Sequence, residues 1–178
     1  MPGRDDAVTV SFGGQVLAAV VGELDDGAAY VDRALSLNAN LANGWGVSGW
    51  MKICFGEPDV AIEHEARAMR LSPLDPRLFA WQFHTAYAYL FTGRYDEAAS
   101  WAARSLRYQP NHLAPMRILA ASDALAGRLD EAQRAMTRLR LLDPALRISN
   151  LEDVLPPFRR AEDRAKLVEG LRKAGLPE

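Results

Sequence analysis

A repeat of 34 residues runs through this 178-residue chain and constrains its fold more than any other feature. Residues 93–98 read Gly-Arg-Tyr-Asp-Glu-Ala, and residues 127–132, 34 positions later, read Gly-Arg-Leu-Asp-Glu-Ala. Pro110 and Pro144 keep the same offset. A period of this length indicates an array of small units, each of which stacks on its neighbours.

Apolar residues recur at helical spacing between the repeated motifs. After Gly93 they stand at Ala98, Ala99, Ala102 and Leu106, and after Gly127 at Ala132, Ala135, Met136 and Leu139. This spacing predicts helices with one buried face. Because a single helix pair cannot cover its own apolar face, successive pairs are expected to stack into one continuous core.

The period and its internal pattern resemble the tetratricopeptide repeat (TPR) family, whose unit is a helix–turn–helix. The resemblance implies an all-α fold, a right-handed superhelical solenoid of antiparallel helix pairs with a glycine in each turn. Trp45 and Gly49 match the family's Trp and Gly positions in the first helix of a repeat. The first repeat departs from the pattern, because Gly27 replaces the packing Ala and Ala39 replaces the terminal Pro.

We expect four repeats in an array over residues 1–146, at 8–41, 42–75, 79–112 and 113–146. The remaining segment, 147–178, does not fit a fifth repeat. It is expected to form a short turn at 151–155, capped by Asn150, and a helix at about 160–174. These C-terminal capping helices are expected to cover the exposed face of the last repeat, which terminal repeats need for solubility.

Longer strings are similar to the C-terminal TPR region of bacterial class III adenylate and guanylate cyclases. They include residues 32–40, 45–50, 70–76 and 169–178. The resemblance implies a regulatory module from a larger bacterial signalling protein, in which an upstream domain makes the cyclic nucleotide. Similar regions follow winged-helix DNA-binding domains, so the effector domain of a TPR transcriptional regulator is the alternative. Since this chain has no Gly-rich phosphate loop, we expect it not to be an enzyme itself.

Charge and composition exclude several kinds of partner. Lys and Arg number 21 against 23 Asp and Glu, so the formal net charge of −2 gives no drive toward direct contact with nucleic acid. The sequence has no run of ~20 mainly apolar residues that would predict a membrane span. The single cysteine, Cys54, cannot form an internal disulfide and fits a reducing, cytoplasmic compartment. We expect a buried structural thiol there.

The densest cluster of ionisable residues is Glu63-His64-Glu65. Adjacent residues of a helix point in different directions, so these three side chains cannot converge on one metal ion. The cluster is therefore interpreted as a solvated helix face. Neither a metal site nor a cofactor site is expected.

The family register places the first helix of each repeat along a concave groove that binds protein segments. The residues predicted to line it are Phe12, Asn43, Val47, Trp50, Phe83, His84, Tyr87 and Arg117. Aromatic side chains together with arginine are typical of binding hot spots. The alternative, that Trp50, Phe83 and Tyr87 only fill the core between helices, stays open, because helical spacing does not separate the two roles.

The polar side chains of this predicted groove limit what it binds. It holds one arginine and one asparagine, which is unlike TPR grooves that clamp a C-terminal carboxylate with several such residues. We expect instead an amphipathic helix or an extended apolar segment. That segment would come from another protein, from an upstream catalytic domain of the same protein, or from a second copy in a homodimer.

Overall fold

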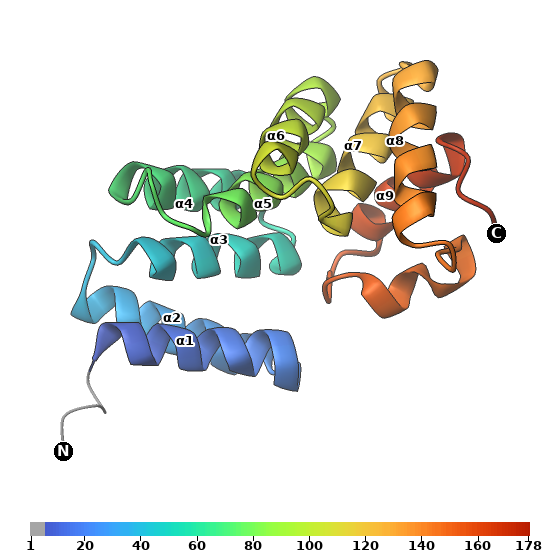
Figure 1. Ribbon diagram of the computed structural model, residues 1–178. Helices are drawn as coiled ribbons and strands as arrows, with labels where there is room; N and C mark the ends of the chain where they lie inside the picture. Colours follow the sequence, from blue (N-terminus) through green and yellow to red (C-terminus); the bar gives the residue numbers. More distant parts are fainter. Residues whose placement is uncertain (1–5) are drawn as a thin grey trace.

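The computed structural model describes residues 6–178, and the regular elements in that part of the chain are all helical (Figure 1). Eight helices form pairs: α1 (Ala7–Val16) with α2 (Leu24–Leu37), α3 (Ala42–Phe55) with α4 (Pro58–Leu71), α5 (Leu78–Phe91) with α6 (Tyr95–Tyr108), and α7 (Leu113–Leu125) with α8 (Leu129–Leu142). A π-helical turn, η1 (Leu17–Val21), extends α1. The 3₁₀ helix η2 (Ile148–Val154) and α9 (Ala161–Lys173) follow the array. The predicted all-α solenoid is confirmed.

Each pair reverses direction at a glycine in the left-handed region. Gly22, Gly56, Gly93 and Gly127 have φ angles between 78° and 86°. Residues with a Cβ atom adopt this conformation at a cost, whereas glycine adopts it readily. The repeated glycines therefore mark the tight turns inside the helix pairs.

The second helix of each pair packs through fixed positions. The fourth residue of α2, α4, α6 and α8 is a buried glycine or alanine, which lets the partner helix approach closely. The eighth residue is also buried in each helix, and these residues are Val31, Glu65, Ala102 and Met136. Three of them are apolar, as a core position requires, and Glu65 is the exception.

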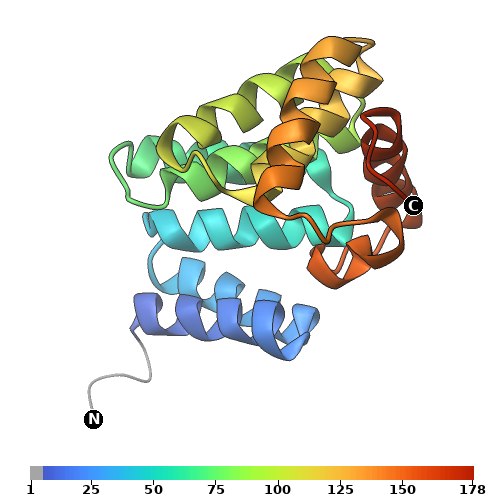
Figure 2. The same cartoon turned by 45° about the vertical axis from the view of Figure 1, so that its right-hand side comes forward.

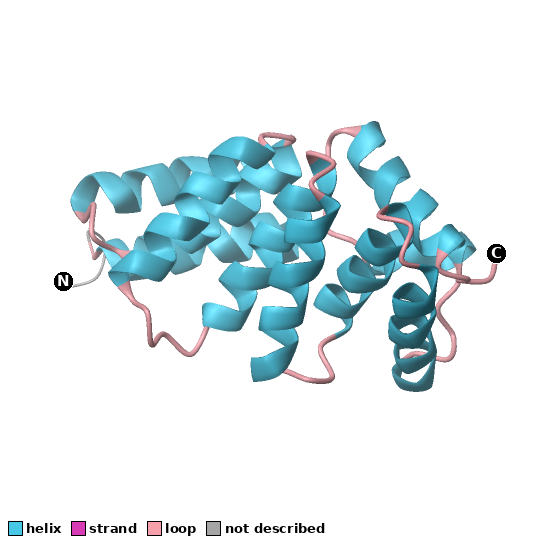
Figure 3. Ribbon diagram, turned by 90° about the horizontal axis from the view of Figure 1, so that it is seen from above, coloured by secondary structure: helices cyan, strands magenta, loops and turns pink. Residues whose placement is uncertain are grey.

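The first helices of the pairs form one continuous surface. α1 contacts α3, α3 contacts α5 and α5 contacts α7. In residues 6–178 the second helices contact the first helix of the next pair far more than they contact one another. The array is therefore concave on the side of α1, α3, α5 and α7, which we call the inner face. Seen from above, the helices form a row joined by short loops (Figure 3).

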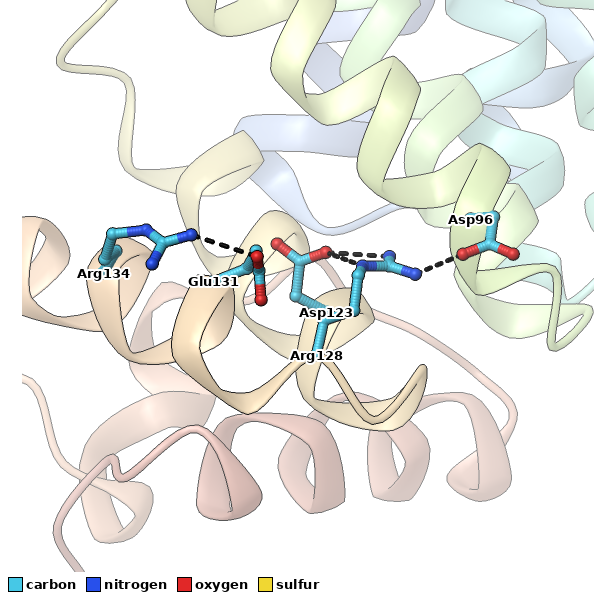
Figure 4. A network of polar contacts seen from close by, with 5 residues as sticks. All are labelled: Asp96, Asp123, Arg128, Glu131 and Arg134. Carbon is cyan, nitrogen blue, oxygen red and sulfur yellow. Dashed lines mark hydrogen bonds and ion pairs between the residues drawn. The ribbon is translucent and has the colours of Figure 1, made fainter.

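A small ionic network links the third helix pair to the fourth (Figure 4). Arg128, at the start of α8, donates from Nε to Asp123 Oδ1 of α7 at 2.9 Å and also pairs with Asp96 of α6. Farther along α8, Arg134 pairs with Glu131 at 3.1 Å. Burial raises the pKa of Asp123, and the bond from Arg128 partly offsets that effect. Arg128 thus holds the turn of the fourth pair against the third.

The C-terminal helix lies on the inner face. The helix expected at about 160–174 is present as α9, and it packs along α7 and reaches α5 (Figure 2). At Gly170 of α9, an added Cβ would lie 2.7 Å from the Cβ of Ala121, so the two helices meet without room for a larger side chain. α9 therefore covers the inner side of α7.

The segment before α9 differs from the expectation in detail. Asn150 is not an N-cap: η2 begins after Arg147, and Asn150 Oδ1 accepts a bond from the Arg147 backbone N–H at 2.8 Å. Its side chain therefore closes the turn from inside the helix. The first five residues of the array expected over 1–146 lie outside the described part of the chain.

Candidate functional site

The inner face has two parts that differ in what covers them. The covered half comprises α7 and the C-terminal end of α5, against which the chain's own C-terminal segment packs. The open half comprises α1, α3 and the N-terminal end of α5. The predicted groove residues are divided between the two: Tyr87 and Arg117 lie in the covered half, and Phe12, Asn43, Val47, Trp50, Phe83 and His84 in the open half.

An aromatic side chain from the C-terminal segment covers Tyr87. The ring of Phe158 lies 5.3 Å from the Tyr87 ring and 5.0 Å from the Phe91 ring, edge to face in both cases. Tyr87 is consequently only 1% exposed. Its predicted place on an open groove is therefore corrected: in this structure Tyr87 binds the chain's own Phe158 and offers no surface to a partner.

Arg117 is covered by the same segment. Its guanidinium donates to the carbonyl of Val154 at 3.2 Å, and the residue is 5% exposed. Farther along, the backbone N–H of Arg159 donates to the carbonyl of Cys54 at 2.8 Å. Residues 154–160 thus run from α7 past the end of α5 to the end of α3. The prediction that Arg117 lines an open binding groove is therefore also corrected. Its guanidinium bonds to a carbonyl of the same chain, that of Val154.

A cavity of about 410 Å³ marks the open half. Its apolar wall includes Val47 and Trp50 of α3 and Phe79 and Trp81 of α5, and its polar groups include Asn43 and His84. η1 and the end of α1 close the third side. The volume and the mixture of apolar walls with a few polar groups are typical of a binding pocket.

Phe12 and Phe83, the other two residues predicted for the open half, do not line this cavity, but each contacts a residue that does. Phe12 is 45% exposed, and the guanidinium of Arg77 lies 5.9 Å from its ring. Phe83 is partly buried, with its ring 4.6 Å from the ring of His84 and 4.9 Å from that of His112. Phe83 thus supports His84 from the side, whereas Phe12 is an exposed apolar side chain next to Arg77.

Two polar groups of the cavity are Asn43, which is buried, and His84, whose side chain is 13% exposed. Asn43 is 6% exposed, and its Nδ2 has no hydrogen-bond partner within residues 6–178. His84 Nδ1 lies 2.8 Å from Oε1 of Glu65, which is fully buried. Burial lowers the pKa of His84 to about 3 and raises the pKa of Glu65 well above its usual value. Burial therefore favours the uncharged form of both groups, and a neutral Glu65 carboxyl is able to donate to Nδ1.

The position of Glu65 corrects the interpretation of residues 63–65 as a solvated face. Glu65 points into the core because it follows Ala61 by four residues and precedes Ala68 by three, on the buried side of α4. Gly49 of α3 makes room for it: a Cβ at Gly49 would lie 2.7 Å from the Glu65 carboxyl carbon. The i, i+4, i+7 spacing was the sequence signal that could have placed Glu65 in the core.

Other reactive groups are accounted for by packing. Cys54 is buried, as expected, and burial raises the pKa of its thiol to about 12, which keeps it protonated. Residues 6–178 contain no group of three or more His, Cys, Asp or Glu arranged to hold a metal ion. None of the helices in the same range has both the length and the apolar character needed to cross a bilayer.

Paired helices, glycine turns and a concave row of first helices together define the TPR type of solenoid. Solved structures with this fold resemble the chain. PilW, a "widely conserved type IV pilus biogenesis factor", superposes with a TM-score of 0.72 at 18% identity over 96% of this chain and 72% of its own. YrrB, "a TPR protein with an unusual peptide-binding site", gives 0.65 at 21% identity over 96% and 86%.

MamA, in a double mutant, superposes with a TM-score of 0.68 at 16% identity over 97% of this chain and 98% of its own. At these identities the likeness is one of fold. No protein-family model matches the chain, and no curated protein sequence matches it. None of the three structures is described as a cyclase, so the predicted cyclase context stays a prediction.

Proposed function

We propose that this chain is a non-catalytic protein-interaction module that binds an extended segment of another protein in the open half of its inner face. The observation that carries the proposal is the cavity of about 410 Å³ between α1, α3 and α5, which the chain's own C-terminal segment leaves free. Its apolar walls suit an apolar side chain, and its buried polar groups suit a peptide backbone. The description of YrrB as peptide-binding agrees with a ligand of this class.

A displayed library of random linear peptides, selected on the wild-type chain, tests this function. Trp50→Ala removes part of the cavity wall, and we expect it to weaken selected peptides by tenfold or more, because aromatic anchors carry much of the energy of such interfaces. Trp101→Ala is the matched control, since Trp101 lies on α6, outside the inner face. Peptides that bind Trp50→Ala as tightly as wild type would contradict the proposed site.

A second copy of the chain is the competing occupant. Light scattering during size-exclusion chromatography separates the two: a monomer leaves the cavity free for another protein. A dimer that Trp50→Ala dissociates would instead assign the open half to self-association, which an upstream cyclase that works as a dimer could use.

The resemblance of the longer strings to cyclase C-terminal regions motivates a proposal about context. We propose that the module regulates or assembles an upstream adenylate or guanylate cyclase domain in the cytoplasm of a bacterium. The effector domain of a winged-helix regulator is the second candidate. The coding sequence upstream of residue 1 distinguishes them, because a cyclase domain and a basic helix-turn-helix segment have different motifs. An upstream sequence with neither would refute both.

A further inference from the structure

The buried pair Glu65–His84 stands at a position where the rest of the array is apolar. The eighth residues of α2, α6 and α8 are Val31, Ala102 and Met136, and only α4 places a carboxyl there. A buried carboxyl lowers stability unless its hydrogen bonds repay the loss of water. Glu65 makes one such bond, to His84, and its Oε2 has no partner in the described chain. The fold alone gives no reason for this group.

The geometry leaves one ring nitrogen of His84 for the cavity. Glu65 occupies Nδ1 at 2.8 Å, so Nε2 is the ring nitrogen left for the cavity that His84 lines. A neutral imidazole carries one proton, and when Nδ1 accepts from the Glu65 carboxyl that proton resides on Nε2. The Phe83 ring, 4.6 Å away, holds the imidazole from the side. In that arrangement His84 presents an uncharged N–H to the cavity.

A second donor lines the same cavity. Asn43 Nδ2 is buried, belongs to a residue only 6% exposed, and has no acceptor among residues 6–178. A buried unpaired N–H costs free energy, and a ligand that supplies an acceptor recovers it. Arg77 also lines the cavity, but its guanidinium is paired with the Asp75 carboxylate at 3.0 Å. The donors left for a ligand therefore suit neutral carbonyl oxygens rather than a carboxylate.

The covered half shows how this inner face holds a non-helical segment that includes a tight turn, in which the Phe158 N–H donates to the Pro156 carbonyl at 2.8 Å. Residues 154–160 place an aromatic side chain, Phe158, between Tyr87 and Phe91. An inner-face side chain, Arg117, donates to the carbonyl of Val154, the last residue of η2. The open half also combines an aromatic wall, at Trp50 and Trp81, with hydrogen-bond donors, at Asn43 and His84.

We propose that Glu65 is a positioning residue that fixes His84 as a hydrogen-bond donor. His84 and Asn43 then together bind the backbone carbonyls of an extended, uncharged peptide segment. An apolar side chain of that segment enters the cavity. The proposal rests on the proposed function and adds the chemistry by which the ligand is recognised. A segment from a partner protein is the occupant, because the chain's own equivalent is already bound next to it.

The proton position can be measured without a ligand. Ring ¹⁵N chemical shifts of His84 in the wild-type chain are expected to show the proton on Nε2 and none on Nδ1 at neutral pH. The same result is expected for Glu65→Gln, whose amide N–H also donates to Nδ1. In Glu65→Leu the two tautomers are expected to mix. A proton on Nδ1 in the wild type would overturn the proposal.

Binding of the library-selected peptides provides the second test. Glu65→Leu and Asn43→Ala are each expected to weaken binding about tenfold, the effect of one lost hydrogen bond in a buried site. Glu65→Gln is expected to bind within about twofold of wild type. Leucine resembles the apolar residues at the equivalent positions of the other helices, so Glu65→Leu is expected to fold.

The outcomes separate this inference from the proposed function. If Trp50→Ala abolishes binding while Glu65→Leu and Asn43→Ala bind like wild type, the donor pair is refuted and the binding site stands. If the peptides bind Trp50→Ala as tightly as wild type, the proposed function is refuted and this inference is refuted with it. If Glu65→Gln is as weak as Glu65→Leu, the donor to Nδ1 is not what matters and the positioning role is refuted.

Discussion

The two halves of the inner face are built from the same row of first helices, yet one is core and the other is surface. Tyr87 and Trp50 are both aromatic residues of first helices. Tyr87 is 1% exposed under Phe158, whereas Trp50 is only partly buried and lines a cavity. The helices themselves do not decide this difference. The path of residues 154–160 decides it, so that the C-terminal segment sets the length of groove available to a partner.

Phe158→Ala is expected to give the largest change. Phe158 is 8% exposed and packs on two rings, so its removal is expected to lower the free energy of unfolding by about 3–5 kcal/mol. Urea denaturation measures this value. Phe12→Ala in the open half is the matched control, since Phe12 is 45% exposed and its loss should change stability by about 0.5 kcal/mol. If the two substitutions lower the free energy of unfolding equally, Phe158 is not more tightly packed than Phe12, and the distinction between a covered and an open half is wrong.

Gly46→Ala probes the packing behind the open cavity. An added Cβ would lie 2.0 Å from Nε1 of Trp81, which is 2% exposed and has little room to move. The expected loss is about 1–3 kcal/mol, with a shift in tryptophan fluorescence. At Gly13 of α1 a Cβ would find its nearest neighbour at 3.8 Å, so Gly13→Ala should instead raise stability by up to ~1 kcal/mol. If Gly46→Ala leaves stability and fluorescence unchanged, the Trp81 side chain is able to move and the cavity wall is not rigidly packed.

Glu65→Leu is expected to stabilise the chain by about 1–2 kcal/mol near neutral pH, because it replaces a buried carboxyl with an apolar side chain. The gain depends on pH. Burial raises the folded-state pKa of Glu65 above its ordinary 4.5. The contribution of Glu65 to wild-type stability is therefore fully present below about pH 4.5 and is lost as pH rises toward the folded pKa.

Urea denaturation at about pH 5 and about pH 8 should therefore show the difference between Glu65→Leu and wild type growing with pH, by at most ~1.4 kcal/mol per unit. Burial lowers the pKa of His84, and this makes stability rise with pH. Because His84 is present in both proteins, this effect largely cancels in the difference between them. A difference that shrinks with rising pH would show that Glu65 is ionised in the fold.

Arg159→Ala is expected to have the smallest effect. Arg159 pairs with Asp25 at the surface, and its guanidinium lies 4.6 Å from the ring of Phe55. Exposed pairs contribute little, and salt screens them, so the melting temperature should fall slightly at low ionic strength and not at high. Arg172→Ala, which breaks a pair with nearby Glu178, is the control for a local contact. A large loss with Arg159→Ala would mean that the first helix pair depends on this contact.

The sequence predicted the array well because its signals are local and repeated. A turn glycine with positive φ, small residues at the helix contact and the 34-residue period each act within one repeat. The covering of Tyr87 and Arg117 was not predictable in this way. It depends on where residues 154–160 pack, and Phe158 meets partners far away in sequence. Only Pro156-Pro157, which favours an extended backbone, hinted that Phe158 could reach across.

The open half was predicted in part. Asn43, Val47 and His84 were placed on the inner face from the repeat register, and the structure brings them together at one cavity. Glu65 was missed, because its charged neighbours Glu63 and His64 suggested a solvated helix. Helical phase outweighs local composition here, since a side chain four residues after a buried alanine faces the same way.

The contact between residues 154–160 and the start of the array also affects how the chain folds. Helical arrays usually form contacts only between neighbours, so they can unravel from either end, and their contact order is low. In this chain Arg159 reaches both Asp25 and the carbonyl of Cys54, joining positions up to 134 apart. Loop closure over that span should slow folding relative to an open array. It should also make the second and third helix pairs lose their structure together with the C-terminal segment, because Phe158 packs on α5 and the Arg159 backbone bonds to the end of α3.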